Sequence, residues 1–235
     1  MPILEKVKEK SMRKAMFFLY FFIFAVFVYA GDIANFVNLG FSPDGSYFAF
    51  GQYGLTDEKY QSYAEIYCID VKKNDFLPAG TFKITPTLET TDKDSKNIFL
   101  SLQDRSARLL SKFKINTKNE GRPIYVITNE TLNDKTLFFK DFETGDDYMV
   151  ILNKEHKSNM EVSFYINLEI TKPNGSKIKK EIGQKGKVRA GVKDYFIKKI
   201  IIDNTNSGLV FIIEKHVYDK IGNSIRFMVE TVKIN

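Results

Sequence analysis

The chain has a single cysteine, Cys68, which excludes a fold held together by intramolecular disulfide bonds. Its neighbours Ile66, Tyr67 and Ile69 form an apolar stretch, which predicts that Cys68 is a small buried side chain and a poor nucleophile. Because Cys68 lies far from the amino-terminal apolar segment, it offers no lipid-attachment site there. The hydrophobic core must therefore supply the stability.

Histidine is also scarce, and the common catalytic and cofactor motifs are missing. His156 and His216 are the two histidines, sixty residues apart, each next to a glutamate. A zinc site usually takes three or four ligands, so two distant histidines do not predict a metal site. No serine lies in a GxSxG motif, and the chain contains neither a P-loop nor GxGxxG. We therefore predict no catalytic residues, no metal and no cofactor.

The sequence has neither a dense basic stripe nor the composition of a disordered tether. Aromatic residues make up 14% of the chain and there are only six prolines, which favours a folded domain. Residues 1–30 hold five basic and two acidic residues, so the rest of the chain is only mildly basic. This balance predicts no nucleic-acid partner. We interpret the one basic concentration as a solvated loop beside a strand rather than a polyanion or membrane-surface site: Lys177, Lys179, Lys180, Lys185, Lys187 and Arg189.

The amino-terminal segment has the features of an export signal. Arg13 and Lys14 precede an apolar run of 16 residues, and Val28-Tyr29-Ala30 places small residues before a polar pair. Since about 20 helical residues are needed to cross a bilayer, we predict cleavage after Ala30 and a periplasmic or secreted protein. The alternative is an uncleaved anchor in the inner membrane, which would be the only membrane contact. Met12 is a possible true start.

The segment that follows the signal has a strand-turn-strand-loop-strand pattern. We predict strands at 36–41, 47–52 and 64–71, a tight turn at 42–45 and a longer polar loop at 54–62. In the turn, the proline presets one backbone angle, the aspartate bonds backbone amides and the glycine accepts a left-handed conformation.

The same pattern recurs twice, which indicates an internal repeat of three-stranded antiparallel units. We predict a mainly β fold, arranged either as an incomplete propeller or as a two-sheet sandwich, in a single domain of residues 31–235. The middle copy has strands at 137–142, 148–152 and 161–171, and the last has strands at 196–202, 209–213 and 224–234.

Two further elements interrupt the repeats. Residues 96–113 carry apolar side chains at helical spacing with basic residues between them, which predicts one amphipathic helix that packs on a sheet. Asn174-Gly175 predicts a tight hairpin after the middle unit.

The stretch FSPDGSYFAFGQYG at 41–54, followed by AEIYCIDV at 64–71, resembles a family of predicted secreted bacterial proteins of unknown function. Its members, found in spirochaetes and other Gram-negative bacteria, open with this pattern after a signal peptide and close with a segment similar to 197–234. The resemblance implies export and no established reaction, so no catalytic residues are carried over. A weaker resemblance, over about one blade, is to a TolB-like or WD-like β-propeller, in which SPDG joins two strands.

Tyr53, Tyr60 and Tyr63 are the candidate binding residues, because tyrosines among polar residues are favoured at recognition surfaces. Packing of these rings onto the domain itself is the alternative. We expect an exported cell-envelope protein, a non-enzymatic binding or structural module, with an envelope protein or a cell-wall component as partner.

The alternative function is a carboxylate-dependent hydrolase acting on a cell-wall or other envelope polymer. Acidic residues surround the first unit, and such an enzyme needs two of them about 5 to 9 Å apart in a cleft. The acids in question are Asp44, Asp57, Glu58 and Glu65.

Overall fold

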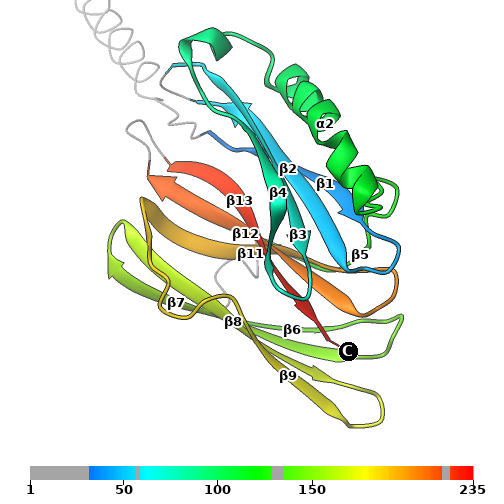
Figure 1. Ribbon diagram of the computed structural model, residues 1–235. Helices are drawn as coiled ribbons and strands as arrows, with labels where there is room; N and C mark the ends of the chain where they lie inside the picture. Colours follow the sequence, from blue (N-terminus) through cyan, green and yellow to red (C-terminus); the bar gives the residue numbers. More distant parts are fainter. Residues whose placement is uncertain (1–31, 57–58, 129–134, 219–222, 235) are drawn as a thin grey trace, which may run out of the picture. The chain divides into compact units, whose positions relative to one another are not determined.

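The computed structural model describes residues 32–56, 59–128, 135–218 and 223–234. The predicted signal segment, its cleavage site and the alternative start lie outside these residues. The described chain forms three antiparallel sheets and one α-helix (Figure 1). This confirms a mainly β fold of repeated antiparallel units with one helix.

Each sheet contains one of the predicted three-stranded units plus additional strands. Sheet I has the order β1-β2-β3-β4 and consists of β1 (Asn35–Phe41), β2 (Tyr47–Leu55), β3 (Ser62–Asp70) and β4 (Asp75–Ile84). Sheet II has the order β10-β8-β7-β6, with β9 also paired to β8, and consists of β6 (Thr136–Lys140), β7 (Asp147–Ser158), β8 (Glu161–Thr171), β9 (Lys177–Ile182) and β10 (Arg189–Ala190). Sheet III has the order β13-β12-β11-β5 and consists of β5 (Arg122–Val126), β11 (Val192–Ile202), β12 (Gly208–Tyr218) and β13 (Asn223–Lys233). Between β4 and β5 lie a 3₁₀ turn, η1 (Leu88–Thr90), and the helix α2 (Ser95–Lys112).

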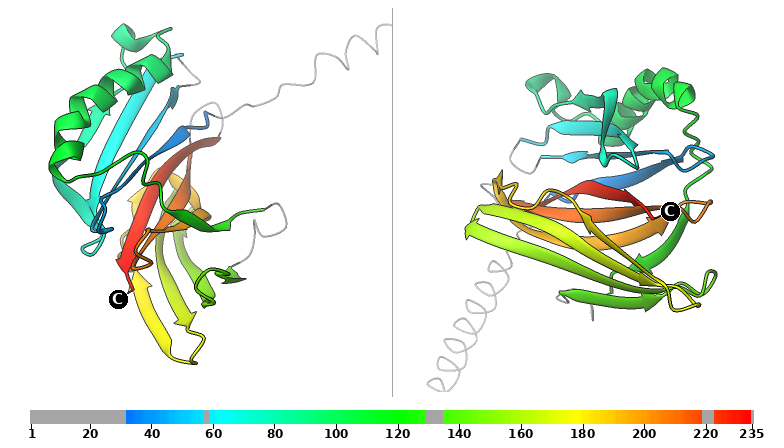
Figure 2. Two further views of the ribbon diagram at one scale, coloured as in Figure 1. Left: turned by 90° about the vertical axis from the view of Figure 1, so that its right-hand side faces the viewer. Right: turned by 60° about the horizontal axis from the view of Figure 1, so that its bottom comes forward.

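Sheet III is the central layer, because its strand β12 is buried on both faces. Leu209, Phe211 and Ile213 point into the core shared with sheet II. Val210 and Ile212, which alternate with them, point into the core shared with sheet I. The right-hand view of Figure 2 shows the resulting order of layers: α2, sheet I, sheet III, sheet II. Face-to-face packing of this kind is sandwich-like, and the propeller resemblance is not confirmed.

The helix α2 covers the face of sheet I that points away from sheet III, as predicted. The carboxylate of Asp94 caps its first turn by accepting a hydrogen bond from the backbone N–H of Asn97 at 2.7 Å. Its buried side chains Phe99 and Leu102 share a core with Cys68 of β3, which is fully buried. Burial raises the pKa of the Cys68 thiol to about 12. This confirms Cys68 as a small core residue.

The three units are closed by closely similar turns, which supports an internal repeat. In each turn, the residue after the first strand donates its backbone N–H to the carbonyl of the residue five positions later, at 2.9 Å. The equivalent positions are Ser42, Asp141 and Asp203. The first and last turns also have a left-handed residue at the same place, Gly45 and Asn206. A side chain at Gly45 would collide with Asp203, so glycine is required there for the close approach of the two turns.

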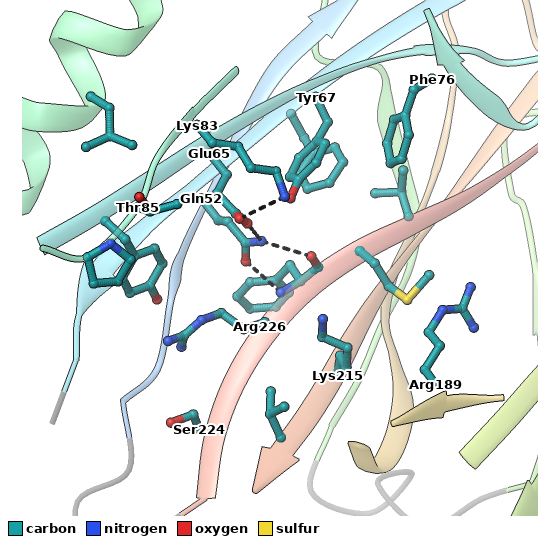
Figure 3. Close-up of a pocket in the computed structure, with 18 of the residues that line it drawn as sticks. Gln52, Glu65, Tyr67, Phe76, Lys83, Thr85, Arg189, Lys215, Ser224 and Arg226 are labelled. Atoms are coloured by element: carbon teal, nitrogen blue, oxygen red, sulfur yellow. Dashed lines mark hydrogen bonds and ion pairs between the residues drawn. The ribbon is translucent and has the colours of Figure 1, made fainter. Parts of the chain in front are cut away.

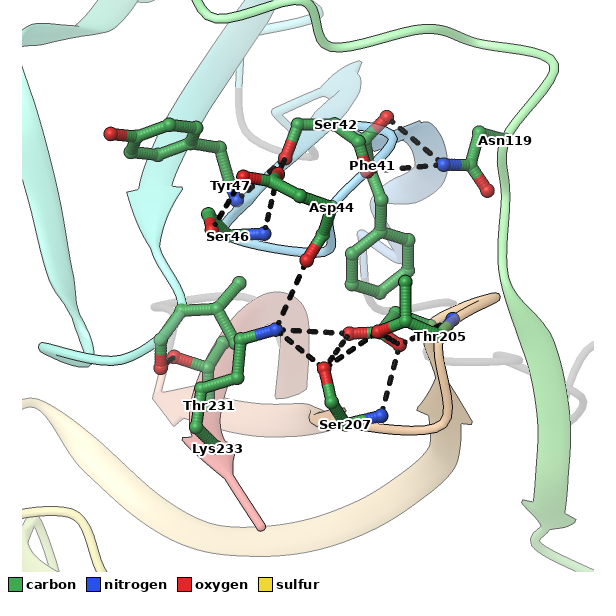
Figure 4. Close-up of polar contacts among 12 residues, drawn as sticks. Phe41, Ser42, Asp44, Ser46, Tyr47, Asn119, Thr205, Ser207, Thr231 and Lys233 are labelled. Carbon is green, nitrogen blue, oxygen red and sulfur yellow. Dashed lines mark hydrogen bonds and ion pairs between the residues drawn. The ribbon is translucent and has the colours of Figure 1, made fainter. Parts of the chain in front are cut away.

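Lys233 at the end of β13 ties the first and last turns together. Its Nζ donates to the Asp44 carbonyl and to Asp203 Oδ2, both at 3.3 Å, and to Ser207 Oγ at 2.7 Å (Figure 4). Asn119 adds hydrogen bonds from its side-chain amide to the carbonyls of Phe41 and Ser42. These polar groups are satisfied by one another, so we assign the network a structural role.

The ion pair in the turn of the middle unit should make the stability of the fold depend on pH in the acidic range. Arg122 forms a bidentate ion pair with the buried Asp141 at 2.6 and 2.9 Å, which together with further hydrogen bonds lowers the Asp141 pKa to about 2. Because this pKa is below its unfolded value of about 3.9, the pair stabilises the fold above about pH 4, by about 2 kcal/mol, and that contribution is lost as the pH falls toward about 2. We expect Asp141→Asn to lower the free energy of unfolding near neutral pH. Urea titrations should also show that this free energy decreases less in the variant than in the unmodified protein between about pH 4 and about pH 2. An unchanged pH slope in the variant would contradict this assignment.

Side chains of sheet I and of the turn that follows β3 form hydrogen bonds with backbone groups at the free edge of β13. Without these bonds the backbone groups would be buried and unpaired. Gln52 accepts from the Phe227 N–H at 2.7 Å and donates to the Phe227 carbonyl at 3.2 Å. The Asn74 side chain accepts from the Thr231 N–H at 2.7 Å. Sheet I is thereby held beside β13, and this placement forms one side of the groove described below.

Two boundary predictions and one loop prediction were wrong. The strands β7 and β12 run to Ser158 and Tyr218, so His156 and His216 lie within strands and not in the loops that follow. The partner strands β8 and β13 continue the hydrogen-bond ladders through these polar residues. Part of the basic run forms β9, where Lys177 and Lys179 pair with Glu169 at 2.6 and 2.9 Å. The turn at Asn174-Gly175 is confirmed between β8 and β9.

Candidate binding groove

The three candidate tyrosines lie in different environments and do not form one surface. Tyr60 is 64% exposed, whereas Tyr63 is only 4% exposed and belongs to the core between sheets I and III. Tyr53 points to the opposite face of sheet I, where its ring packs 5.1 Å from that of Phe99 on α2. Of the three, only Tyr63 lines the groove described next, and it does so from within the core.

Substitution of Tyr63 and of Tyr60 should therefore affect the free energy of unfolding to very different extents. We expect Tyr63→Ala to lower the free energy of unfolding by about 2 to 3 kcal/mol, because it opens a cavity in the core. We expect Tyr60→Ala to change it by less than about 0.5 kcal/mol, because that ring is exposed. Urea unfolding followed by circular dichroism measures both values. Equal effects of the two substitutions would contradict the placement of Tyr63 in the core.

A groove of about 730 Å³ lies beside β13, between the edge of sheet I and a face of sheet III. One wall comes from β2, β3 and β4, and the other comes from β12, β13, β10 and the segment that leads into β10 (Figure 3). Its size is in the usual range of small-ligand sites. The charged side chains that line it are Glu65, Lys83, Lys187, Arg189, Lys215 and Arg226.

The wall from sheet I is aromatic. The rings of Phe50, Tyr67 and Phe76 follow one another across β2, β3 and β4, with centroids 5.1 and 5.2 Å apart. Phe76 ends this row and is 53% exposed, and Tyr218 across the groove is 58% exposed. Exposed aromatic rings next to a row of buried ones offer apolar contact area that the fold itself does not use.

Three of the cations in the groove are already paired with carboxylates. Lys83 lies 3.3 Å from Glu65, which also accepts a hydrogen bond from Gln52 at 2.7 Å. The Arg226 guanidinium pairs with Asp32 at 2.6 Å and lies over the Tyr63 ring at 4.2 Å. These groups hold the groove in shape.

The third pair, between Arg189 and Glu230, is longer, at 3.8 Å. The Arg189 guanidinium also lies 5.2 Å from the centre of the Phe164 ring, at the edge of the core between sheets II and III. Burial raises the pKa of Glu230, which disfavours its charged form and weakens it as a counter-ion for Arg189.

Lys187 and Lys215 have no carboxylate partner within the described part of the chain. Lys215 is half-buried on β12, and Figure 3 shows it with Arg189 across the groove from Tyr67 and Phe76. Burial lowers the pKa of Lys215, the carboxylate of Glu65 partly offsets this, and the nearby Arg226, Arg189 and Lys83 lower it further. An anion in the groove would relieve this repulsion.

The two described acids of the set proposed for hydrolysis, Asp44 and Glu65, do not meet in this groove. Among the described residues that line it, Glu65 is the one carboxylate, and its two oxygens are engaged by Lys83 and Gln52. Asp44 lies in the first turn, where hydrogen bonds from Ser42 and Ser46 hold its pKa at about 2. Asp57 and Glu58 lie outside the described residues.

The two histidines come nearer to each other than the sequence suggests. Asp194 is the cross-strand partner of His216, and its Oδ1 lies 3.9 Å from His156 Nε2. The described residues contain no cluster of three or more histidine, cysteine or acidic side chains placed to hold a metal ion.

Sequence reasoning missed most of the groove. Lys187 and Arg189 were noted as part of the basic run but interpreted as a solvated loop. Lys83, Lys215 and Arg226 stand alone among strand residues, and no local pattern indicates that they meet. Lys215 lies between Glu214 and His216 in the polar second half of β12, so its sequence neighbours gave no signal either.

A family model described as "Predicted secreted protein (DUF2259)" matches residues 49–233. The chain belongs to this family. The match includes the described residues that line the groove and all of sheets II and III. Neither the curated proteins nor the solved structures contain a match to the chain. In the part of the chain that the structure describes, no helix is long and apolar enough to span a membrane.

Proposed function

We propose that the protein is an exported, non-enzymatic component of the cell envelope that binds an envelope protein or a cell-wall component in the groove beside β13. The observation that carries this proposal is a pair of lysines, Lys187 and Lys215, that have no carboxylate partner in the described part of the chain and line the groove together with exposed aromatic rings. Export is supported by the predicted signal segment and by membership of a family of predicted secreted proteins.

The composition of the groove favours binding over hydrolysis. Hydrolysis of a glycosidic bond needs two carboxyl groups on opposite sides of the bond. The described lining supplies Glu65 alone, and this residue is held by an ion pair and a hydrogen bond. By contrast, aromatic and cationic side chains around a cleft are typical of recognition surfaces.

In-cell crosslinking followed by mass spectrometry tests the proposal. We expect Lys215→Glu to reduce capture of the partner at least about tenfold, because it replaces attraction of an acidic group by repulsion. The matched control is Lys96→Glu, which makes the same charge change at an exposed position of α2, on the other face of sheet I. Equal capture by the Lys215→Glu variant and the unmodified protein would contradict the proposal, provided that circular dichroism shows both to be folded.

A further inference from the structure

The charges that line the groove define the kind of ligand it fits. Three cations lie within ion-pair distance of Glu65, Asp32 and Glu230, whereas Lys187 and Lys215 have no carboxylate at that distance among the described residues. Two uncompensated positive charges in one groove match a dianionic group. A phosphate monoester carries close to two negative charges at neutral pH.

The unpaired cations are lysines and not arginines, which favours a phosphate over a carboxylate as the ligand. A guanidinium forms two parallel hydrogen bonds to a planar carboxylate, and both arginines of the groove are already paired with carboxylates of the protein. The unpaired cations are lysines, whose compact ammonium groups act as point charges and bind a tetrahedral phosphate without a planar match.

The aromatic wall adds a second requirement for the ligand. Phe76 and Tyr218 are more than half exposed, and Figure 3 shows Phe76 and Tyr67 on the side of the groove opposite Lys215. A ring that carries the phosphate would pack its flat face on Phe76 while the phosphate meets Lys215 on the opposite side.

We propose that the groove recognises a phosphate monoester carried on a ring, either as a free sugar phosphate or as a phosphorylated headgroup of an envelope lipid. This inference goes beyond the proposed function, because it assigns a small phosphorylated ligand to the groove that the proposed function assigns to an envelope partner. Charge complementarity is its physical basis: a bound dianion would supply the opposite charge that Lys187 and Lys215 lack within ion-pair distance among the described residues.

Isothermal titration calorimetry on the whole chain tests the inference. The probes are glucose 6-phosphate, glucose, inorganic phosphate and succinate, and the lipid arm uses phosphatidylcholine vesicles with and without phosphatidylinositol 4-phosphate. We expect glucose 6-phosphate to bind more tightly than inorganic phosphate and succinate, glucose not to bind, and added salt to weaken binding. If the protein binds glucose 6-phosphate but not the phosphorylated vesicles, the ligand is a free sugar phosphate. If it binds the phosphorylated vesicles as well, the ligand is a lipid headgroup.

Variants locate the binding. Lys215→Met should weaken binding of glucose 6-phosphate by about tenfold or more, and Lys187→Met, at an exposed position where folding is not at risk, should weaken it by about threefold or more. Lys96→Met on α2 should leave the affinity unchanged.

Three results would overturn the inference: glucose binding as well as its phosphate, succinate binding more tightly, or the Lys187 and Lys215 variants binding with unchanged affinity. If no phosphate probe binds while Lys215→Glu still abolishes partner capture in cells, the ligand assignment fails and the proposed function stands. If the sugar phosphate binds in the groove while capture in cells is unaffected, the proposed function fails instead.

Discussion

Phe211→Ala is expected to lower the free energy of unfolding by about 3 to 5 kcal/mol, the range measured for large buried aromatic side chains. Phe211 is fully buried on β12, the strand that contributes to the cores on both sides of sheet III. Its neighbours Leu209 and Ile213 are held in the same core by strand partners on either side, so they have little freedom to fill the cavity.

Urea unfolding followed by circular dichroism measures this loss. Phe138→Ala is the matched control, because the same ring is 74% exposed on β6, and it should change the free energy of unfolding by less than about 0.5 kcal/mol. A loss below about 1 kcal/mol for Phe211→Ala would contradict the central position of sheet III.

Asp203→Ala is the second substitution with a large expected effect, about 3 to 5 kcal/mol, because it leaves a half-buried cation without its partner. The Asp203 side chain is 1% exposed and accepts hydrogen bonds from the backbone N–H groups of Thr205 and Ser207, at 2.8 and 3.1 Å. It also receives Lys233 Nζ at 3.3 Å. The substitution therefore removes the interactions that shape the last turn and those that join it to β13.

A double substitution and a surface control give this prediction its specificity. Asp203→Ala combined with Lys233→Met should be less destabilised than Asp203→Ala alone, since the unpaired ammonium is then gone. Asp147→Ala removes an exposed carboxylate that lies 3.6 Å from Lys140, and should cost less than about 1 kcal/mol. If Asp147→Ala and Asp203→Ala lower the free energy of unfolding by the same amount, the turn network adds no more stability than a surface ion pair.

Local features of the fold were predictable from the sequence because short segments carry them. The turn at Ser42-Pro43-Asp44-Gly45 contains residues whose backbone preferences define it, and the apolar spacing of residues 96–113 defines α2 to within a residue at each end. The ends of β7 and β12 were missed because their polar residues, such as His156 and Lys215, lack an apolar alternation. These segments remain strands because of the partner strands beside them.

The stacking of the sheets and the groove were not predictable in the same way. The central position of sheet III depends on which faces of β12 meet which sheets, and contacts between residues far apart in the sequence decide this. The groove combines cations from β4, the segment before β10, β12 and β13, and each of them alone looks like an ordinary surface residue. The tyrosine loop was chosen on local composition, which does not reveal that Tyr63 points into the core.

Site-specific photocrosslinking in cells tests most directly whether the groove is the surface that meets the partner. A photoreactive phenylalanine analogue replaces Phe76, which is 53% exposed in the groove, or Leu100, which is 47% exposed on α2. We predict a discrete crosslinked product from position 76 that Lys215→Glu abolishes, and none from position 100. The same product from both positions, or one from position 76 that persists in the Lys215→Glu variant, would contradict the assignment of the groove.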